Sequence, residues 1–363
     1  MNVVVKIGTS SVTDAHGEID PAPVEKLCTE VAGLRGSHHR VVIVTSGAIS
    51  AGLPALGLTG ARPTDSATLQ AVSAVGQHRL MRVYDQALDR HGLIAGQVLL
   101  APLDFVNRNQ YLHARQTLTR LLDLGVVPVV NENDAVADDE IRFGDNDRIA
   151  ALVAHLIGAD ILVLLTDTPG LLTADPRLDA GASLIEEIVQ VDEALEAAAG
   201  GAGQQGSGGM ASKLAAARMA AWSGVTAVIA SASRTGVLEE AVYGAAGVGT
   251  VFRPHDRRLP ARKLWIAFAV GASGRIRVDA GARLALQDKG RSLLPAGVVG
   301  VEGSFQVDDA VELVDPDGRV FAKGLVRHPS ARVAEWAGRR SADLPPELSA
   351  VIVHRDDLVV LGD

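Results

Sequence analysis

The stretch Val3-Val-Val-Lys-Ile-Gly-Thr-Ser-Ser11 decides the fold class of this chain of 363 residues. A short, nearly continuous run of β-branched residues is typical of a strand buried on both faces of a parallel sheet. The run ends in a glycine and three hydroxyl residues, and an apolar pattern with helical spacing follows over residues 21–34. A strand, a polar turn and a helix in this order predict the first unit of an α/β sheet.

The same plan recurs along the first two thirds of the chain. Further strands are expected at residues 41–44, 94–100, 126–130, 161–165 and 225–230. Helical patterns lie between and after them at residues 68–90, 112–124, 148–157, 191–199 and 210–223. We therefore expect a three-layer αβα sandwich around a mainly parallel sheet.

The pattern changes near residue 253. Residues 253–263 are basic and contain two prolines, which is typical of a linker. Short strand-like segments punctuated by Gly and Asp follow at residues 274–278, 297–302, 310–314 and 320–325. These segments predict a small β-rich barrel. The expected division is a first domain over residues 1–253, a linker over 254–263 and a second domain over 264–363.

Composition restricts the classes of function. The net charge is −9, and residues 264–363 carry 12 Lys and Arg against 14 Asp and Glu. Neither the overall net charge nor the charge of residues 264–363 favours a protein that binds RNA, DNA or an anionic membrane. We find no signal-peptide pattern and no apolar run long enough to cross a bilayer, and the single cysteine, Cys28, cannot form an internal disulfide. We therefore expect a soluble, cytoplasmic protein.

Polar side chains follow four of the expected strands, at the point where each strand ends. They lie in Gly8-Thr-Ser-Ser11, Thr45-Ser-Gly-Ala48, Asn131-Glu-Asn-Asp134 and Thr166-Asp-Thr-Pro-Gly170. In an open parallel sheet, ligands bind beyond the carboxyl ends of the strands. Gly and Ser are common in such turns for structural reasons. Four polar turns at the same edge of the sheet, however, predict one binding cleft there.

A glycine-rich stretch, Gly206-Ser-Gly-Gly-Met-Ala-Ser-Lys213, precedes the last predicted helix of the first domain. It fits a dinucleotide fingerprint formally, but it follows a helix and not a strand, and it does not match the P-loop spacing. A phosphate site of another kind and a plain flexible linker both remain open. The residues of Phe143-Gly-Asp-Asn-Asp147 can cap the next helix, yet one cap needs only one of them.

Six motifs, in this order along the chain, make a specific resemblance. They are Lys6-Ile-Gly-Thr-Ser, Val44-Thr-Ser-Gly-Ala, Val130-Asn-Glu-Asn-Asp-Ala-Val, Gly144-Asp-Asn-Asp, Leu165-Thr-Asp and Gly208-Gly-Met-Ala-Ser-Lys. Together they closely resemble the glutamate 5-kinases, which have the amino-acid-kinase fold. The segment around residues 274–350 resembles the PUA domain that bacterial members of this family often carry.

The resemblance implies a role for each matching residue. Lys6, Lys213 and Asp167 would be catalytic. The ATP site would be formed by Lys6, Gly8, Thr166, Asp167, Ser207, Gly208, Gly209, Met210, Ala211, Ser212 and Lys213. Glutamate would be held by Ser46, Gly47, Asp134, Asn146 and Asp147. Where Ala211 stands the family commonly has serine, so one hydroxyl is absent from the phosphate loop.

The resemblance also implies the reaction, which is transfer of phosphate from ATP to the side-chain carboxylate of glutamate, the first step of proline biosynthesis. A carboxylate is ionised at neutral pH, so no general base is needed. Mg²⁺ would be held by phosphates and water, with no protein metal cage, and Asp167 would orient the lysines. Feedback by proline, a homo-oligomer and coupling to a glutamyl-phosphate reductase are further expectations. Acetylglutamate, aspartate, carbamate and UMP remain alternative acceptors, and the second domain is expected to serve regulation or assembly.

Overall fold

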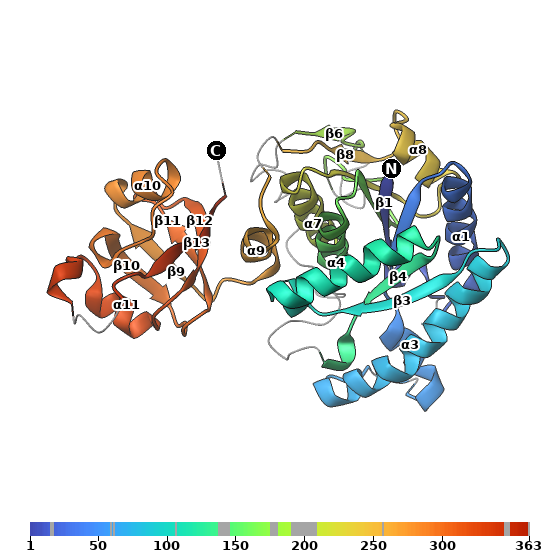
Figure 1. Cartoon of the computed structure of the whole chain (residues 1–363), viewed down its shortest axis with the longest axis horizontal. Coiled ribbons are helices and arrows are strands. Elements are labelled where there is room, and N and C mark those ends of the chain that lie inside the picture. Colours follow the sequence, from blue (N-terminus) through green and yellow to red (C-terminus); the bar gives the residue numbers. More distant parts are fainter. Residues whose placement is uncertain are drawn as a thin grey trace. The chain divides into compact units, whose positions relative to one another are not determined.

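The computed structural model describes residues 1–14, 18–58, 60, 62–105, 107–136, 146–174, 181–189, 209–255, 258–344 and 349–361. The chain divides into two compact units, Met1–Arg258 and Leu259–Asp363, and each has its own sheet (Figure 1). The expected α/β fold with a second, β-rich part is confirmed. Among the described residues, no helix combines the length and the apolar character needed to span a membrane.

The first unit contains an eight-stranded sheet in the order β3-β4-β2-β1-β5-β7-β8-β6. The strands are β1 Asn2–Ile7, β2 Arg40–Val44, β3 Ala95–Leu100, β4 Val127–Glu132, β5 Ile161–Thr166, β6 Glu187–Ile188, β7 Thr226–Ser231 and β8 Thr250–Phe252. Neighbouring strands run parallel, except that β8 pairs antiparallel with β7. The carboxyl ends of β1, β2, β4, β5 and β7 therefore lie at one edge of the sheet.

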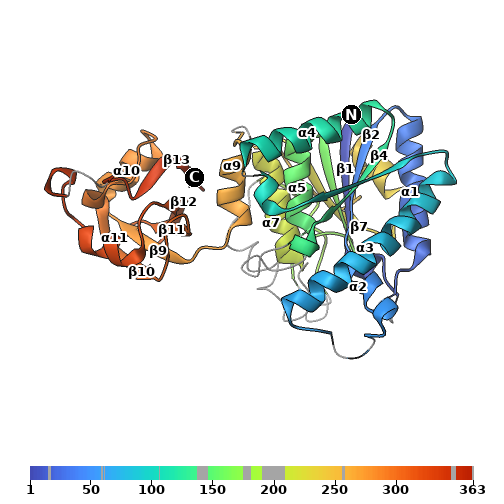
Figure 2. The same ribbon diagram turned by 60° about the horizontal axis from the view of Figure 1, so that its bottom comes forward.

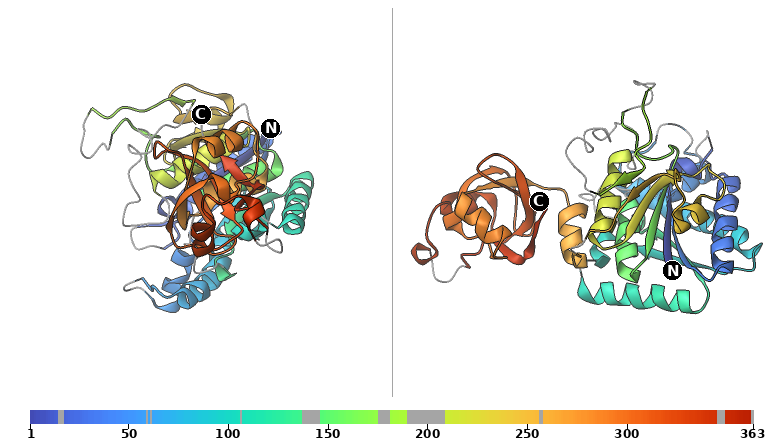
Figure 3. Two further views of the ribbon diagram at one scale, coloured as in Figure 1. Left: turned by 90° about the vertical axis from the view of Figure 1, so that its left-hand side faces the viewer. Right: turned by 90° about the horizontal axis from the view of Figure 1, so that it is seen from above.

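Helices cover both faces of this sheet (Figures 2 and 3). They are α1 Pro21–Gly36, α2 Ala48–Gly52, α3 Ser66–Asp89, α4 Arg108–Asp123, α5 Asn146–Ile157, α7 Met210–Trp222 and α8 Val237–Tyr243. Alternate residues of a strand point to opposite faces. Val3 and Val5 of β1 join the core beneath α1, whereas α5 contacts β1 from the other side. Burial on both faces explains why the strands are continuous apolar runs.

Two glycines bring α2 and α3 into backbone contact. A Cβ atom on Gly76 of α3 would lie 1.7 Å from the carbonyl oxygen of Ala48, and one on Gly52 of α2 would lie 2.1 Å from the carbonyl oxygen of Val72. No other residue fits at either position without moving a helix. The short helix α2 is thereby fixed on α3, which matters because α2 begins directly after the Thr45–Gly47 loop.

The second unit is built around a five-stranded sheet in the order β10-β9-β11-β12-β13. Its strands are β9 Gly274–Val278, β10 Val298–Gly303, β11 Ala310–Val314, β12 Val320–Val326 and β13 Val353–Val360, and its helices are α9 Ala261–Leu264, α10 Ala280–Gln287 and α11 Ser330–Trp336. Strands β9 and β11 are parallel, and the other pairs are antiparallel. Its core contains the aromatic side chains of Phe305, Phe321 and Trp336.

Several elements differ from the sequence-based expectations. Helices α2, α8, α10 and α11 and strands β6, β8 and β13 were not predicted. Most of them are short, and in β13 Asp356 and Asp357 interrupt the apolar pattern. Helix α9 lies partly within the range 254–263 that we expected to be a linker. The helix expected over 191–199 lies outside the described residues.

Candidate active site

The predicted site residues lie where the central strands end. In the sheet register, Lys6 of β1 lies beside Val44 of β2 on one side and Leu164 of β5 on the other. The loops that begin at Thr45 and Asp167 therefore start close to the level of Lys6. Strand β4 lies on the far side of β2, with Val130 beside Val44, and brings its own carboxyl end to the same edge.

One group of charged residues, which we call the phosphate end, consists of Lys6, Asp147, Ser212 and Lys213. Asp147 stands in the first turn of α5, and Ser212 and Lys213 stand in the first turn of α7. The Lys6 ammonium lies 2.6 Å from Asp147 Oδ1, and the Lys213 ammonium lies 3.3 Å from Asp147 Oδ2. The Ser212 hydroxyl also donates to Asp147 Oδ2, at 3.1 Å. One carboxylate thus holds two lysines that come from different elements.

Burial makes the charge balance of the phosphate end important. Lys6, Asp147 and Lys213 are respectively 3%, 1% and 5% exposed. Burial alone would raise the pKa of Asp147, but Lys6 and Lys213 more than reverse this and lower it. Burial lowers the pKa of Lys213, against the attraction of Asp147. Two ammonium groups and one carboxylate leave an excess positive charge, which suits a phosphate.

The other predicted phosphate contacts surround this group. A Cβ atom on Gly8 would lie 3.4 Å from the Lys6 ammonium, so glycine leaves open the space next to that charge. Gly209 is the N-cap of α7, and Met210 and Ala211 lie half-buried in its first turn. Free backbone N–H groups at such a helix start are suited to anions. Ser207 and Gly208 lie outside the described residues.

Thr166 and Asp167 follow β5 at the same edge of the sheet. The Thr166 hydroxyl donates to Asp167 Oδ1 at 3.0 Å, and the Thr166 carbonyl accepts from the Ala232 N–H at 2.7 Å. We expected Asp167 to orient the lysines. In the structure both lysine ion pairs are made by Asp147, and Asp167 is a weaker favourable charge for Lys213, so the expected role of Asp167 stays a prediction.

A second group, which we call the acceptor end, lies between α3, β4 and α5. It consists of Ser73, Gln77, Asn131, Asp134 and Asn146, and all five are buried. The Ser73 hydroxyl donates to Asp134 Oδ2 at 2.9 Å, and Asn146 Oδ1 accepts from the Glu132 N–H at 3.1 Å. Burial raises the pKa of Asp134, against the hydrogen bond from Ser73 and the charge of Arg62.

The Ser46–Gly47 loop reaches the same edge from β2. Gly47 has a φ of 110°, and a Cβ atom there would also meet Ile19 and Val12, so glycine is required. The preceding Thr45 is fully buried, and its hydroxyl lies 2.8 Å from that of Tyr84 on α3. This contact, like the two close glycines, fixes the loop on α3.

Sequence reasoning missed the contribution of α3. Ser73 and Gln77 are one helical turn apart and interrupt an otherwise apolar buried stripe that includes Leu69, Leu80 and Tyr84. Two polar residues one turn apart on a buried helix face indicate a polar contact within the fold, and this pattern is visible in the sequence. Their target, the end of β4, could be identified only from the fold.

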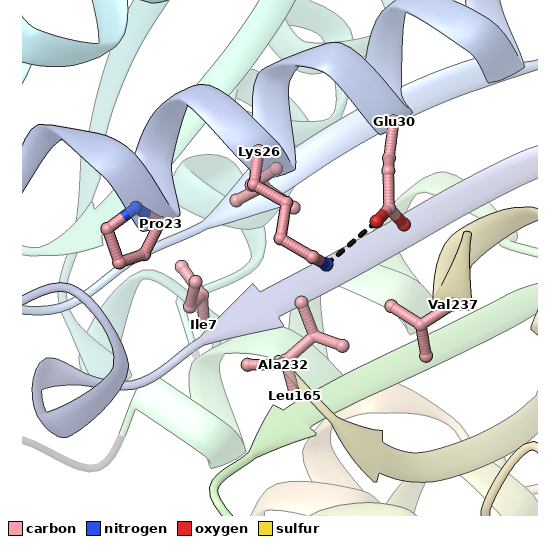
Figure 4. A pocket seen from close by; sticks show the side chains of 8 residues that line it. Ile7, Pro23, Lys26, Glu30, Leu165, Ala232 and Val237 are labelled. Carbon is pink, nitrogen blue, oxygen red and sulfur yellow. Dashed lines mark hydrogen bonds and ion pairs between the residues drawn. The ribbon is translucent and has the colours of Figure 1, made fainter. Parts of the chain in front are cut away.

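A separate pocket lies at the same edge but next to α1 (Figure 4). Its lining includes Ile7 and Leu165, at or near the carboxyl ends of β1 and β5, and Ala232, which follows β7. Lys26 pairs with Glu30 at 2.7 Å and donates to the Arg234 carbonyl, and Glu30 accepts from backbone N–H groups at the start of α8. The Lys26–Glu30 pair therefore holds the loop after β7, in which the Ala232 N–H donates to the Thr166 carbonyl. The pair belongs to neither the phosphate end nor the acceptor end.

Comparisons with known proteins place both parts of the chain in known families. Residues 1–231 match the model of the amino acid kinase family, and residues 274–348 match the PUA domain. Among curated proteins, the chain is 49% identical to a glutamate 5-kinase of Frankia casuarinae, and the match covers 99% of this chain and 96% of that protein. A glutamate 5-kinase of Rhodococcus jostii is 46% identical, with coverage of 99% and 97%.

Among solved structures, the carbamate kinase from Giardia lamblia bound to AMP-PNP has a TM-score of 0.50 and 20% identity to this chain. The match covers 70% of this chain and 98% of that one. A likeness at this identity concerns the fold of the first unit.

Proposed function

The chain belongs to the glutamate 5-kinases of the amino acid kinase family, and from this membership we propose that it transfers the γ-phosphoryl group of ATP to the side-chain carboxylate of glutamate. The products would be ADP and L-glutamyl 5-phosphate, and the reaction would be the first step of proline biosynthesis. The single observation that carries the proposal is the pair of buried lysines held on Asp147 next to a buried, polar acceptor end.

The arrangement suits attack by one anion on another. The glutamate carboxylate is already ionised at neutral pH, so it needs no base to act as the nucleophile. Its oxygen would form a bond to the γ-phosphorus while the bond to the β,γ-bridging oxygen breaks. Lys6 and Lys213 would stabilise the charge on the transferred group, and Asp147 would keep both ammonium groups directed at it.

ATP would lie between the first turn of α7 and the Thr166–Asp167 segment, with Gly8 and Gly209 to Lys213 around its phosphates. Magnesium would arrive with the nucleotide and supply further charge neutralisation. Asp147 is occupied by the two lysines, and Asp167 is the nearby carboxylate that remains exposed. Asp167 would therefore contact the water shell of the ion.

The acceptor end favours free glutamate over acetylglutamate. Asp134 is a buried carboxylate, and its Oδ1 atom has no hydrogen-bond partner among the described residues. A ligand ammonium group would satisfy this atom, and acetylation would remove that charge. Ser46, Gly47 and Asn146 would contact the rest of the amino acid.

The family membership supports further parts of the proposal. The protein would act in the cytoplasm as a homo-oligomer, with proline as feedback inhibitor and a reductase consuming its labile product. The second unit would serve regulation or assembly. Arg275 and Arg277 on β9 are paired with Glu312 and Glu302, which does not favour RNA binding. A variant lacking residues 259–363 that keeps normal proline inhibition and assembly would contradict this role.

Hydroxylamine trapping tests the proposed reaction directly. Acyl phosphates react with hydroxylamine to give hydroxamates, so the protein is incubated with Mg-ATP and with glutamate, acetylglutamate, aspartate or carbamate. We expect hydroxamate with glutamate alone among the three amino-acid substrates, and no ADP release with carbamate. Product from another acceptor, or none from glutamate, would overturn the assignment.

A further inference from the structure

Gln77 on α3 carries a buried hydrogen-bond donor for which the described part of the chain offers no partner. The side chain is 7% exposed, and its Oε1 atom accepts from Asn131 Nδ2 at 2.7 Å. Its Nε2 atom has no hydrogen-bond partner among the described residues. A buried amide donor left without a partner is destabilising, so its retention calls for an explanation.

The hydrogen bonds around Gln77 fix which way its amide points. Asn131 Oδ1 accepts from the Glu132 N–H at 2.9 Å, so Asn131 must present its Nδ2 group to Gln77. Gln77 in turn must present Oε1 to Asn131, and its Nε2 group is directed away from that residue. The same Glu132 N–H also donates to Asn146 Oδ1, so Gln77 is linked through Asn131 to Asn146 at the start of α5.

An acceptor atom that likewise has no partner in the described structure lies in the same cluster as this donor. Asp134 Oδ2 accepts from Ser73, but Oδ1 is buried and has no hydrogen-bond partner among the described residues. Ser73 precedes Gln77 by one turn of α3, so both side chains lie on one face of the helix. Asn131, the partner of Gln77, precedes Asp134 by three residues.

We propose that Gln77 is a specificity-determining residue whose Nε2 group donates to the α-carboxylate of the amino-acid substrate, while Asp134 Oδ1 accepts from its α-ammonium group. The inference rests on the proposed function and names the ligand groups that its acceptor end selects. The reacting carboxylate must lie at the lysines, so the other two charged groups lie at the opposite end of the substrate. Because they share one carbon atom, their partners must lie close together. Gln77 contacts Asn131 at the end of β4, and Asp134, three residues further on, contacts Ser73, one turn before Gln77 on α3.

The site therefore takes α-amino acids in which both the ammonium and the α-carboxylate are unmodified. An α-amide keeps only one acceptor oxygen and carries no negative charge, so the hydrogen bond that it accepts from Gln77 would be weaker than the one accepted by an α-carboxylate. A site built to hydrogen-bond a ligand group discriminates strongly against ligands that lack it, because its own buried group then stays unpaired.

The variant Gln77→Glu tests the inference with little change in shape. Its side chain keeps an oxygen for Asn131 but replaces the donor by an anion that repels the α-carboxylate. We expect the KM for glutamate to rise at least about 30-fold, while the KM for ATP stays within about twofold. Gln77→Met, which removes the donor without adding charge, should raise the KM for glutamate about tenfold.

The matched control is Gln86→Met on the exposed side of the same helix, which should leave both KM values and the melting temperature unchanged.

Two competitors of glutamate, glutarate and γ-aminobutyrate, identify which charged group of the substrate Gln77 contacts. Glutarate lacks the ammonium group, so Gln77→Met should weaken glutarate as it weakens glutamate. γ-Aminobutyrate lacks the α-carboxylate, so Gln77→Met should leave its inhibition constant unchanged.

An unchanged KM for glutamate in both Gln77 variants would overturn the inference. Equal losses for glutamate, ATP and γ-aminobutyrate would also overturn it, because they would indicate only a structural role for Gln77. Hydroxamate formation by the unaltered protein keeps the two proposals apart. If the unaltered protein forms no hydroxamate from glutamate, the proposed function fails. If it does form hydroxamate but the Gln77 variants keep the same KM for glutamate, only the present inference is refuted.

Discussion

The two ends of the site handle buried charge in opposite ways. At the phosphate end, Lys6 and Lys213 share Asp147, so each charged group has an opposite partner before any ligand arrives. At the acceptor end, Asp134 and Gln77 each keep one buried polar atom without a hydrogen-bond partner among the described residues. The first end is assembled in advance for an anion, and the second is completed by its ligand. Substitutions should therefore change turnover at one end and substrate affinity at the other.

Loss of Lys213 should have the largest effect. In Lys213→Ala, Lys6 still pairs with Asp147, so the fold should persist while one of two positive charges on the transferred phosphate is lost. We expect kcat to fall about 10³-fold, by analogy with the removal of one donor to a developing charge. Steady-state kinetics and thermal unfolding provide the measurement. Near-normal turnover would remove Lys213 from the mechanism.

Asp147→Asn should lower kcat about 100-fold and change its pH dependence. Asp147 opposes the lowering of the Lys213 pKa that burial and Lys6 cause, so its removal should lower this pKa further. In the variant, Lys213 therefore loses its proton at a lower pH, and the alkaline limb of the kcat–pH profile should move to lower pH. A profile that keeps its alkaline limb would show that Asp147 does not set the charge of Lys213.

The pH dependence of stability provides a second measurement on Asp147 in the unaltered protein. The pKa of Asp147 in the folded state lies below its ordinary value of 3.8. The ionised carboxylate therefore stabilises the fold at pH values above 3.8, and this stabilisation is lost as the pH falls through the folded-state pKa. Asp147→Asn should remove this part of the acid dependence. Equal acid unfolding curves for the two proteins would argue against a stabilising role.

Asp134→Asn should have a smaller effect, confined to glutamate. We expect its KM to rise about 30-fold, because the substrate ammonium group loses its buried partner. Burial raises the pKa of Asp134, so its ionised form is costly in the free protein at neutral pH. The variant should therefore melt a few degrees higher without ligand. An unchanged KM for glutamate would contradict the assigned role, and a lower melting temperature would show that the charge is compensated within the fold.

Tyr84→Phe should have the smallest effect. It removes the hydroxyl group next to Thr45 and leaves that buried threonine with one partner fewer. We expect a loss of about 1–2 kcal/mol in the free energy of unfolding and an increase of a few fold in the KM for glutamate. Denaturant unfolding and glutamate kinetics measure both. The control is Tyr243→Phe at the exposed end of α8. It removes a hydroxyl that lies 3.3 Å from His39 Nε2, away from the Ser46–Gly47 loop, and should leave the KM for glutamate unchanged.

The sequence predicts the sheet far better than it predicts the acceptor end. Strands such as β1 and β5 are continuous apolar runs because helices cover both faces, so their pattern is strong and local. The link between Asp147 and two lysines joins β1, α5 and α7, and in the local sequence Asp147 has the same appearance as a helix cap. Gln77 lies 54 residues from Asn131, so its role depends on the packing of α3 against β4.

The backbone contact between α2 and α3 has a consequence for local opening. A helix of five residues does not persist alone in water, so α2 keeps its shape only while Gly52 and Gly76 hold it on α3. The two helices therefore form one cooperative unit, and their amide protons should exchange with solvent together. Because the Ser46–Gly47 loop enters this unit directly, glutamate bound there should slow exchange along α3 as far as Tyr84, well beyond the residues it touches.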